Sequence, residues 1–283
     1  FVLSHVYIGS GASRLTRPQT YNFFVARFAR VYPLHIATLI ALLGFYTAIH
    51  ASAATGLINT APPMPGDFAQ FIGNVVLVQA CGVFAHEGWN VPAWSISTEF
   101  AAYLVFPLII LALARARRAA LMALALMSAG FYLFIGTTSG DLDLIVGAAV
   151  LRCYAGFFLG VALFHLRSAA SGVADRTLSF IQISAAALMV ALFEFSGNDV
   201  LLIAPFALLV LFTSEDRGGL ARALAHPVMT KLGDWSYAIY MIHVPIIHIA
   251  GFFFWRTLGR PGMLPDPAAR VIWIVLVYAL TII

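Results

Sequence analysis

Long apolar runs recur along this chain, and most approach the length that an α-helix needs to cross a membrane. A crossing takes about 20 mostly apolar residues, because in lipid only a helix or a closed barrel satisfies its own backbone hydrogen bonds. The candidate runs are 1–9, 32–50, 96–114, 119–135, 144–165, 178–196, 200–213, 235–255 and 269 to the end. We therefore predict an all-α, polytopic transmembrane helix bundle with about nine spans in this sequence.

The composition supports the same fold class. Of the 283 residues, 61% are hydrophobic and only 10% are charged, and the mean hydropathy is +0.92. A soluble domain carries roughly 25% charged residues and covers its apolar core with polar groups, which this chain lacks in number. Disordered chains, secreted disulfide scaffolds and nucleic-acid-binding proteins are excluded. The net charge of +4 is interpreted as a signal of membrane topology.

Basic residues mark the loops on the cytoplasmic side of a membrane protein. Four basic clusters lie between the apolar runs: Arg14, Arg17, Arg27 and Arg30; Arg115, Arg117 and Arg118; Arg167 and Arg176; Arg217, Arg222 and Lys231. All four face one side only if a further apolar run, 68–85, does not cross. This run also carries Gln70, Asn74 and Gln79. We therefore predict that 68–85 is a re-entrant or interfacial helix on the outer side.

Two arginines stand three residues apart in RFARVYPLHIATL, in the loop predicted at 10–31. If a helix begins here, Arg27 and Arg30 share a face. Two guanidinium groups at a membrane interface suit the phosphate or pyrophosphate of a ligand. The alternative is an anchor that contacts lipid headgroups. Pro33 is expected in the first turn of the span that follows.

An ionisable residue lies inside the span that follows HEGWNVPAWSISTE. Glu99 is about one turn inside, with Ser95 one turn before it and Tyr103 one turn after it. A charge in a membrane is costly, so the default hypothesis is a functional role. The alternative is a structural glutamate, bonded to Ser95 or paired to an arginine. Arg152, inside a later span, is the candidate arginine, and Asp143 competes for it.

Other features of these spans are interpreted as structural. Ser95 and Ser97 are candidate N-caps, so neither hydroxyl stands out as a nucleophile. Gly156 and Gly160 are spaced four apart, which predicts a face of close helix packing.

Aromatic and imidazole side chains repeat every three residues in SYAIYMIHVP. Tyr237, Tyr240 and His243 therefore lie near one helix face, where they either line an active cavity or form a hydrogen-bonded packing cluster. The sequence leaves both alternatives open. It contains no HExxH pair, no Cys/His set with metal-ligand spacing, no GxSxG elbow and no phosphate-binding loop, so no metal is expected.

Four segments, in this order, resemble the signatures of the acyltransferase type 3 family. FVLS is similar to the end of FFxLSGFxLS, RFARVYP to RxxRxxP, NVPAWSISTEFAAYLVFP to N…WSLSxE…YLxFP, and GDWSYAIYMIHVPI to GxxSYxxYLxHxP. RCYAGFFLGVALF also resembles the family's R…F..G segment. The resemblance runs from residue 1 to about 255. It implies a ten-span enzyme of the bacterial inner (plasma) membrane that O-acylates glycans and some small molecules.

The resemblance also implies substrates and roles. An acyl group, expected to be acetyl, moves from cytoplasmic acyl-CoA, the co-substrate, to a hydroxyl of a cell-envelope or exported saccharide or glycolipid. The signature positions correspond to Arg27, Arg30, Glu99, Ser236, Tyr237, Tyr240 and His243. We assign Glu99, His243 and Tyr237 to catalysis, Arg27 and Arg30 to the coenzyme, and Trp94, Asn90 and Arg152 to the acceptor.

The family's principal catalytic histidine and its partner arginine lie on a first span, which the resemblance places before residue 1. We expect residues 1–283 to be a single membrane acyltransferase domain that is truncated at both ends and inactive by itself. The rival hypothesis is a transporter or flippase, in which Glu99, Arg152 and His243 form a proton or substrate path. A third is a membrane scaffold or sensor. Only the acyltransferase would consume a thioester.

Overall fold

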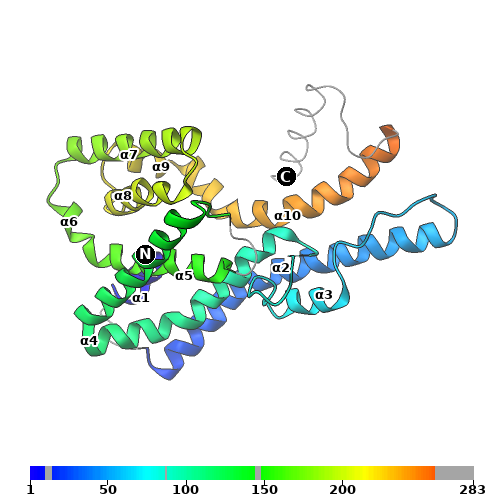
Figure 1. The fold of residues 1–283 in the computed structure, drawn as a ribbon, viewed down its shortest axis with the longest axis horizontal. Coiled ribbons are helices and arrows are strands. Elements are labelled where there is room, and N and C mark those ends of the chain that lie inside the picture. Colours follow the sequence, from blue (N-terminus) through cyan, green and yellow to red (C-terminus); the bar gives the residue numbers. More distant parts are fainter. Residues whose placement is uncertain (10–14, 87, 144–147, 259–283) are drawn as a thin grey trace. The chain divides into compact units, whose positions relative to one another are not determined.

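The chain is mostly helical in the part that the computed structural model describes, which is residues 1–9, 15–86, 88–143 and 148–258 (Figure 1). The helices are α1 (Val2–Tyr7), α2 (Arg17–Ala54), α3 (Phe68–Val75), η1 (Val91–Ala93), α4 (Trp94–Thr138), α5 (Ala149–Leu166), α6 (Ser168–Ser171), α7 (Asp175–Phe195), η2 (Asp199–Leu202), α8 (Ile203–Thr213), α9 (Gly219–Leu224) and α10 (Pro227–Leu258). No strand occurs in these ranges, so the predicted all-α class is confirmed.

Within the described ranges, five helical stretches are long and apolar enough to cross a membrane. They are Arg17–Ala54, Val91–Thr138, Ala149–Leu166, Asp175–Phe195 and Pro227–Phe253. The chain is therefore a multi-pass membrane protein. The predicted number of nine spans is not confirmed by this count, and the run from 269 onward lies outside the described residues.

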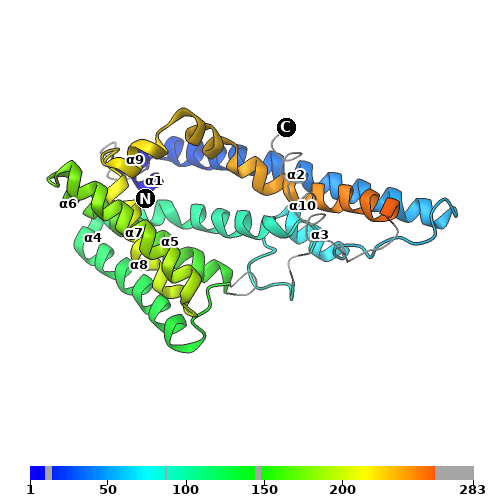
Figure 2. The same cartoon turned by 90° about the horizontal axis from the view of Figure 1, so that it is seen from above.

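Helix α4 contains two of the predicted spans. Its backbone leaves the helical region at Ala116, where φ is −149° and ψ is 67°, so α4 consists of two helical segments. Figure 2 shows α4 changing direction along its length. The break falls between the predicted runs 96–114 and 119–135, inside the basic stretch RARR. The stretch Val91–Thr138 is therefore counted once, although the sequence predicts two spans in it and the backbone breaks between them.

Helix α2 begins well before the predicted span 32–50. Gln19 Oε1 accepts a hydrogen bond from the backbone N–H of Thr16 at 2.9 Å, and Thr16 Oγ1 accepts one from the N–H of Gln19 at 3.4 Å. This reciprocal pair is a capping box, and Pro18 fits the first turn because it needs no N–H donor there.

Two expectations for this region were therefore wrong. The arginines of RFARVYP lie within α2 and not in a loop at 10–31, because the helix already begins at Arg17. Pro33 lies in the interior of α2 and not in its first turn.

Helix α3 is the only helix within the predicted run 68–85. The Asp67 side chain accepts a hydrogen bond from the N–H of Gln70 at 2.7 Å, and Gln70 Oε1 accepts one from the N–H of Asp67 at 2.9 Å. The helix ends before Leu77, which has a φ of 61°. Eight residues extend about 12 Å, whereas the hydrocarbon core is about 30 Å thick. Helix α3 is thus too short to cross, as predicted, and its side of the membrane stays a prediction.

Helix α8 is also too short to cross by itself. Its 11 residues extend about 16 Å, with Pro205 in the first turn and the 3₁₀ turn η2 in front of it. It packs along α7 (Figure 1). The predicted span 200–213 is therefore shorter than the spans around it.

The chain divides into two compact units. Unit 1 consists of Phe1–Ala26 and Thr98–Leu232, and unit 2 consists of Arg27–Ser97 and Gly233–Ile283. Each unit has its own buried apolar side chains and is described by itself below.

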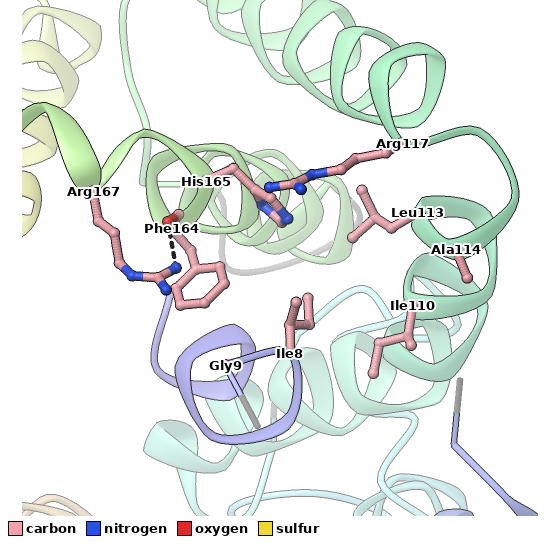
Figure 3. Close-up of a pocket in the computed structure, with 9 residues that line it drawn as sticks. All are labelled: Ile8, Gly9, Ile110, Leu113, Ala114, Arg117, Phe164, His165 and Arg167. Carbon is pink, nitrogen blue, oxygen red and sulfur yellow. Dashed lines mark hydrogen bonds between the residues drawn. The ribbon is translucent and has the colours of Figure 1, made fainter. Parts of the chain in front are cut away.

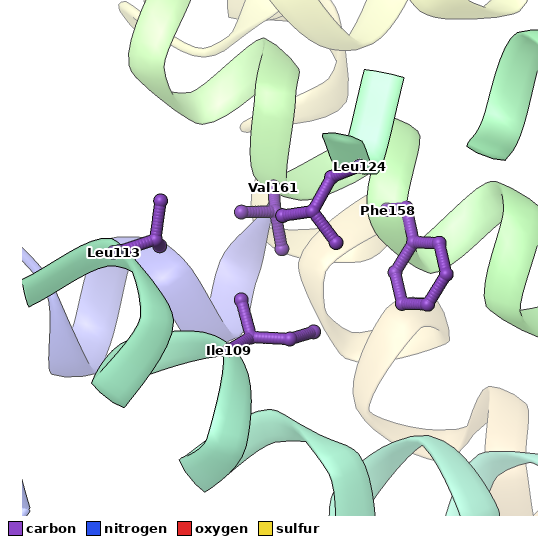
Figure 4. Close-up of a cluster of buried hydrophobic side chains, with 5 residues drawn as sticks. All are labelled: Ile109, Leu113, Leu124, Phe158 and Val161. Atoms are coloured by element: carbon purple, nitrogen blue, oxygen red, sulfur yellow. The ribbon is translucent and has the colours of Figure 1, made fainter. Parts of the chain in front are cut away.

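The core of unit 1 is built from both segments of α4, from α5 and from the start of α2. One cluster comprises Ile109, Leu113, Leu124, Phe158 and Val161 (Figure 4), and a second comprises Phe23, Tyr103, Phe106 and Ile110. The predicted close-packing face of α5 is confirmed, because a Cβ added at Gly160 would lie 2.7 Å from the nitrogen of Phe1. The break at Ala116 lets the two segments of α4 pack on the same helix.

The core of unit 2 is smaller and adjoins buried polar groups. Its apolar cluster comprises Leu39, Leu42, Tyr46 and Trp89. The polar side chains of His35, Thr38, Asn74, Gln79 and Asn90 are all at least 95% buried. Buried polar groups must find hydrogen-bond partners, so these residues determine how the loop after α3 is held.

Candidate functional site

The structure places the predicted site residues in both units. Glu99 and Arg152 belong to unit 1. Arg27, Arg30, Asn90, Trp94, Tyr237 and His243 belong to unit 2. The contacts of each group follow from the helices that carry it.

Tyr237 joins two of the signature segments within unit 2. Its hydroxyl, on α10, donates a hydrogen bond to the backbone oxygen of Val31 on α2 at 2.5 Å. Val31 directly follows Arg30, so the SYAIYMIH segment is tied to the RFARVYP segment. For Tyr237, this contact favours a packing role over a role in lining a cavity.

His243 is half-buried on α10, and its ring orientation is defined by one contact. Its Nδ1 lies 2.6 Å from the carbonyl oxygen of Tyr240. Because a carbonyl only accepts, Nδ1 carries the proton, and in the neutral ring Nε2 has the lone pair. The Tyr240 ring is 5.8 Å from the imidazole, centroid to centroid. An imidazole fixed in this way can accept a proton at Nε2.

Asn90 is a buried cross-link of unit 2. Its Nδ2 donates to Thr38 Oγ1 on α2 and to the Met241 oxygen on α10, both at 3.2 Å, and the residue is only 1% exposed. Both donor hydrogens of the amide are thereby used. The expectation that Asn90 binds the acceptor stays a prediction, but its contacts are those of a residue that joins two helices.

His35 is a buried residue that was not among the predicted site residues. The imidazole is fully buried, and its Nε2 lies 2.8 Å from the backbone oxygen of Asn74, so Nε2 is the protonated nitrogen. No described residue donates to Nδ1. Its position between the arginines and the apolar run is visible in the sequence, but its contact with Asn74 is not.

Two further buried acceptors of unit 2 lack a donor among the described residues. They are Asn90 Oδ1 and Gln79 Oε1. The nitrogen of each of these two amides is hydrogen-bonded, and Gln79 Nε2 donates to the Ala93 oxygen at 2.7 Å. Buried acceptors of this kind are places where water or a ligand hydroxyl is expected.

Glu99 is held by the tyrosine one turn further along α4. The Tyr103 hydroxyl donates a hydrogen bond to Glu99 Oε1. The backbone oxygens of Thr98 and Ala101 accept hydrogen bonds from Cys153 and Tyr154 of α5, at 3.4 and 3.3 Å. The carboxylate therefore lies where α4 and α5 pack together in unit 1.

Arg152 contacts the backbone of the segment that precedes α5. Its Nη1 donates to the backbone oxygen of Leu142 at 2.5 Å. In unit 1, ion pairs join Asp175 to Arg217 and Arg222, and the pairing of Arg152 with Glu99 stays a prediction. A guanidinium bound to a loop carbonyl positions that loop.

The two serines near Glu99 have structural contacts, as predicted, but these contacts are not the N-caps that the sequence suggested. Ser97 Oγ donates to the Leu77 oxygen at 2.7 Å and accepts from the Ala80 N–H at 3.3 Å, which ties the start of α4 to the turn after α3. Ser95 Oγ donates to the Pro92 oxygen at 3.0 Å. Neither serine is an N-cap of α4. Trp94, the predicted stacking face, is half-buried as the first residue of α4.

The two signature arginines differ in exposure. Arg27 is half-buried and Arg30 is exposed, three residues apart on one continuous helix. Between and after them, the rings of Phe28 and Tyr32 stack at 4.1 Å. The helical spacing required for a two-arginine clamp is therefore present.

Unit 2 also contains a pocket of about 550 Å³ near the end of α2. Aromatic and proline side chains line most of it, including Phe45, Phe252, Pro62 and Pro63. Its polar edge is a hydrogen-bonded pair, in which Tyr46 Oη and His248 Nδ1 are 3.0 Å apart. A pocket of this size and character suits a small organic molecule with an apolar body and a hydroxyl.

Comparisons with known proteins agree with this picture. The family model described as an acyltransferase domain matches residues 1–283. The acyltransferase MdmB of Streptomyces mycarofaciens is 27% identical over 267 residues, which is 80% of this chain and 61% of the relative. The chain thus spans less than two thirds of that relative's length. No solved structure matches the chain. With its whole length matched by the family model, this chain belongs to the acyltransferase type 3 family.

Proposed function

We propose that this chain is the membrane part of an enzyme that moves an acyl group, acetyl in our expectation, from cytoplasmic acyl-CoA to a hydroxyl of a cell-envelope or exported saccharide. Membership of the acyltransferase family carries the proposal. The contact between Tyr237 and Val31 supports it, because it joins the arginine segment to the histidine segment within unit 2.

The proposed reaction needs three kinds of group. The acceptor hydroxyl oxygen attacks the thioester carbonyl, the carbon–sulfur bond breaks, and the hydroxyl proton ends on the sulfur of CoA. A base takes the proton, hydrogen-bond donors stabilise the oxyanion, and cations hold the phosphates. The family resemblance assigns the main base to a histidine on the first span of the family.

We assign the remaining roles to residues of this chain. Arg27 and Arg30 bind CoA phosphates, since their spacing on α2 presents two guanidinium groups to one ligand. His243 lines the site and accepts or returns a proton through Nε2, because its Nδ1 is bonded to a carbonyl. Tyr237 holds α10 against α2. Glu99, fixed by Tyr103, orients the acceptor or the base.

We assign three residues of this chain to the acceptor. Trp94 offers an indole face on which a sugar ring could stack, and Asn90 and Arg152 stay as proposed acceptor residues. In this structure the polar groups of Asn90 and Arg152 contact neighbouring backbone or side-chain atoms, so we expect these two to act by holding the site in shape.

The test is release of CoA thiol from acetyl-CoA by the purified full-length protein, with and without a membrane glycan extract. Glu99→Ala and Arg27→Ala should each reduce release. Their matched controls, Glu194→Ala and Arg176→Ala, change exposed residues of α7 and should not. If folded wild-type protein releases no thiol under either condition, the proposal is wrong and a transporter or flippase becomes the better hypothesis.

A further inference from the structure

A pocket of about 360 Å³ in unit 1 brings together basic residues from two different clusters of the sequence. Arg117 comes from the stretch RARR in α4, and Arg167 follows the end of α5. Figure 3 shows the Arg117 guanidinium beside the imidazole of His165, with Arg167 on the other side of the pocket. None of these three residues has a role in the function proposed above.

The positive charge of this pocket is not balanced by a carboxylate. Its lining contains no Asp or Glu among the described residues. Asp175 forms ion pairs with Arg217 and Arg222, and none of these three residues lines the pocket. Two guanidinium groups that line one pocket without a carboxylate in its lining favour the binding of an anion between them.

One donor of the pocket, the guanidinium of Arg167, is fixed before any ligand binds. Arg167 Nη1 donates to the Phe164 oxygen at 3.1 Å, and its Cζ lies 4.0 Å from the centre of the Phe164 ring. His165 Nδ1 lies 3.0 Å from the Val161 oxygen, so Nδ1 is protonated and Nε2 of the neutral ring is an acceptor, which leaves the two arginines as the donors for an anion. The break at Ala116 places Arg117 at the start of the second segment of α4. Preorganised donors lose little freedom on binding.

The rest of the pocket is apolar. Ile8, Ile110, Leu113 and the Phe164 ring form its wall. A small inorganic anion would use only the arginines, whereas a phosphate ester that also carries a ring or an acyl chain would use both surfaces. The two surfaces together select an amphipathic phosphate.

We propose that the Arg117–Arg167 pocket binds the phosphate of an amphipathic phosphate ester, supplied either by coenzyme A or by the headgroup of an anionic phospholipid. For coenzyme A the inference rests on the proposed function, and it adds a phosphate contact beyond Arg27 and Arg30. For the phospholipid it is independent of the reaction. In both cases Arg117 and Arg167 hold the phosphate oxygens and the apolar wall holds the adjoining group.

The experiment uses full-length protein in lipid nanodiscs and four single variants. Arg117→Gln and Arg167→Gln remove the pocket cations. Arg115→Gln and Arg118→Gln are the matched controls, because they change exposed arginines of the same basic stretch that do not line the pocket. Size-exclusion profiles and thermal unfolding establish that each variant is folded. Arg167 also binds a backbone carbonyl, so the Arg117 variant decides the result if the Arg167 variant does not fold.

Two measurements separate the two sources of the phosphate. In nanodiscs of phosphatidylcholine, equilibrium binding of radiolabelled coenzyme A should weaken about tenfold or more in the pocket variants, the loss expected for a charge-assisted hydrogen bond, and stay unchanged in the controls. In nanodiscs that contain phosphatidylglycerol, native mass spectrometry should show retained phosphatidylglycerol in wild type and controls but not in the pocket variants.

The binding measurements on the pocket can be interpreted separately from the thiol-release test of the proposed function. A selective loss in either measurement supports the pocket and names its ligand. If neither coenzyme A affinity nor phosphatidylglycerol retention differs between Arg117→Gln and the controls, the inference is overturned. Failure of wild type to release thiol would refute the proposed function, but the phospholipid measurement would still decide the pocket.

Discussion

Asn90→Ala distinguishes a substrate-binding residue from a structural cross-link. The side chain donates to Thr38 Oγ1 and to the Met241 oxygen at 3.2 Å each and is 1% exposed. A neutral hydrogen bond contributes about 1 kcal/mol to stability, so the loss of two lowers the free energy of unfolding by about 2 kcal/mol. For a protein of this size, that corresponds to a fall in Tm of roughly 4–8 °C.

The assay compares wild type, Asn90→Ala and Asn22→Ala, which changes an exposed asparagine of α2. Thermal unfolding in detergent measures stability, and thiol release measures kcat and the acceptor KM below the unfolding range. We expect a lower Tm and an unchanged acceptor KM for Asn90→Ala, and no change for Asn22→Ala. An unchanged Tm with a KM raised several-fold would show that Asn90 contacts the acceptor, and the argument from its two donors would be refuted.

Three other substitutions test contacts within unit 1. Gln182→Leu removes a fully buried amide that binds two backbone carbonyls, and should lower the free energy of unfolding by roughly 2–5 kcal/mol; a change below about 1 kcal/mol in chemical denaturation would contradict this. Gly218→Ala should lower thermal stability where Gly172→Ala does not, because Gly218 has a φ of 91° and its Cβ would lie 2.5 Å from Gln182 Oε1; equal unfolding temperatures would argue against strain. Tyr103→Phe removes the donor to Glu99 and should lower kcat about tenfold or more with the acyl-CoA KM unchanged, whereas full turnover in the thiol assay would make the contact dispensable.

Hydropathy predicted the helices that cross the membrane because long apolar runs have few other ways to satisfy their backbone in lipid. It did not predict where α2 begins. Arginines near a membrane surface were interpreted as loop residues, yet arginine is a good helix former, and the helix continues through them to Thr16. The TRPQ sequence, with Thr16 and Gln19 in a capping box, contained the missing signal.

The basic stretch at 115–118 was interpreted correctly as an interruption. Charged residues between two apolar runs favour a turn at the membrane surface, and the backbone breaks at Ala116. The stretch does not reveal that Arg117 lines the same pocket as Arg167, which is 50 positions further along the chain. Whether two distant residues line one pocket depends on how α4 packs against α5, and the local sequence does not encode this packing.

The polar contacts of unit 2 were beyond prediction for the same reason. Tyr237 and Val31 are 206 residues apart, and Asn90 and Met241 are 151 apart. Helical periodicity indicates which side chains share a face, but a hydrogen bond to a backbone oxygen of another helix depends on tertiary packing. Asn90 was assigned to the acceptor with the family resemblance, which carries no information on these two contacts.

The buried polar groups of unit 2 have a common chemical character. His35 Nδ1, Gln79 Oε1 and Asn90 Oδ1 all accept hydrogen bonds, and among the described residues none of them has a donor. Orphaned acceptors cannot satisfy one another, so what completes them must bring O–H or N–H groups. Water fits this requirement, and so does a substrate hydroxyl. Unit 2 therefore uses these amide donors for contacts within itself and leaves buried acceptors that a hydroxyl group can complete, as the proposed transfer to a hydroxyl would require.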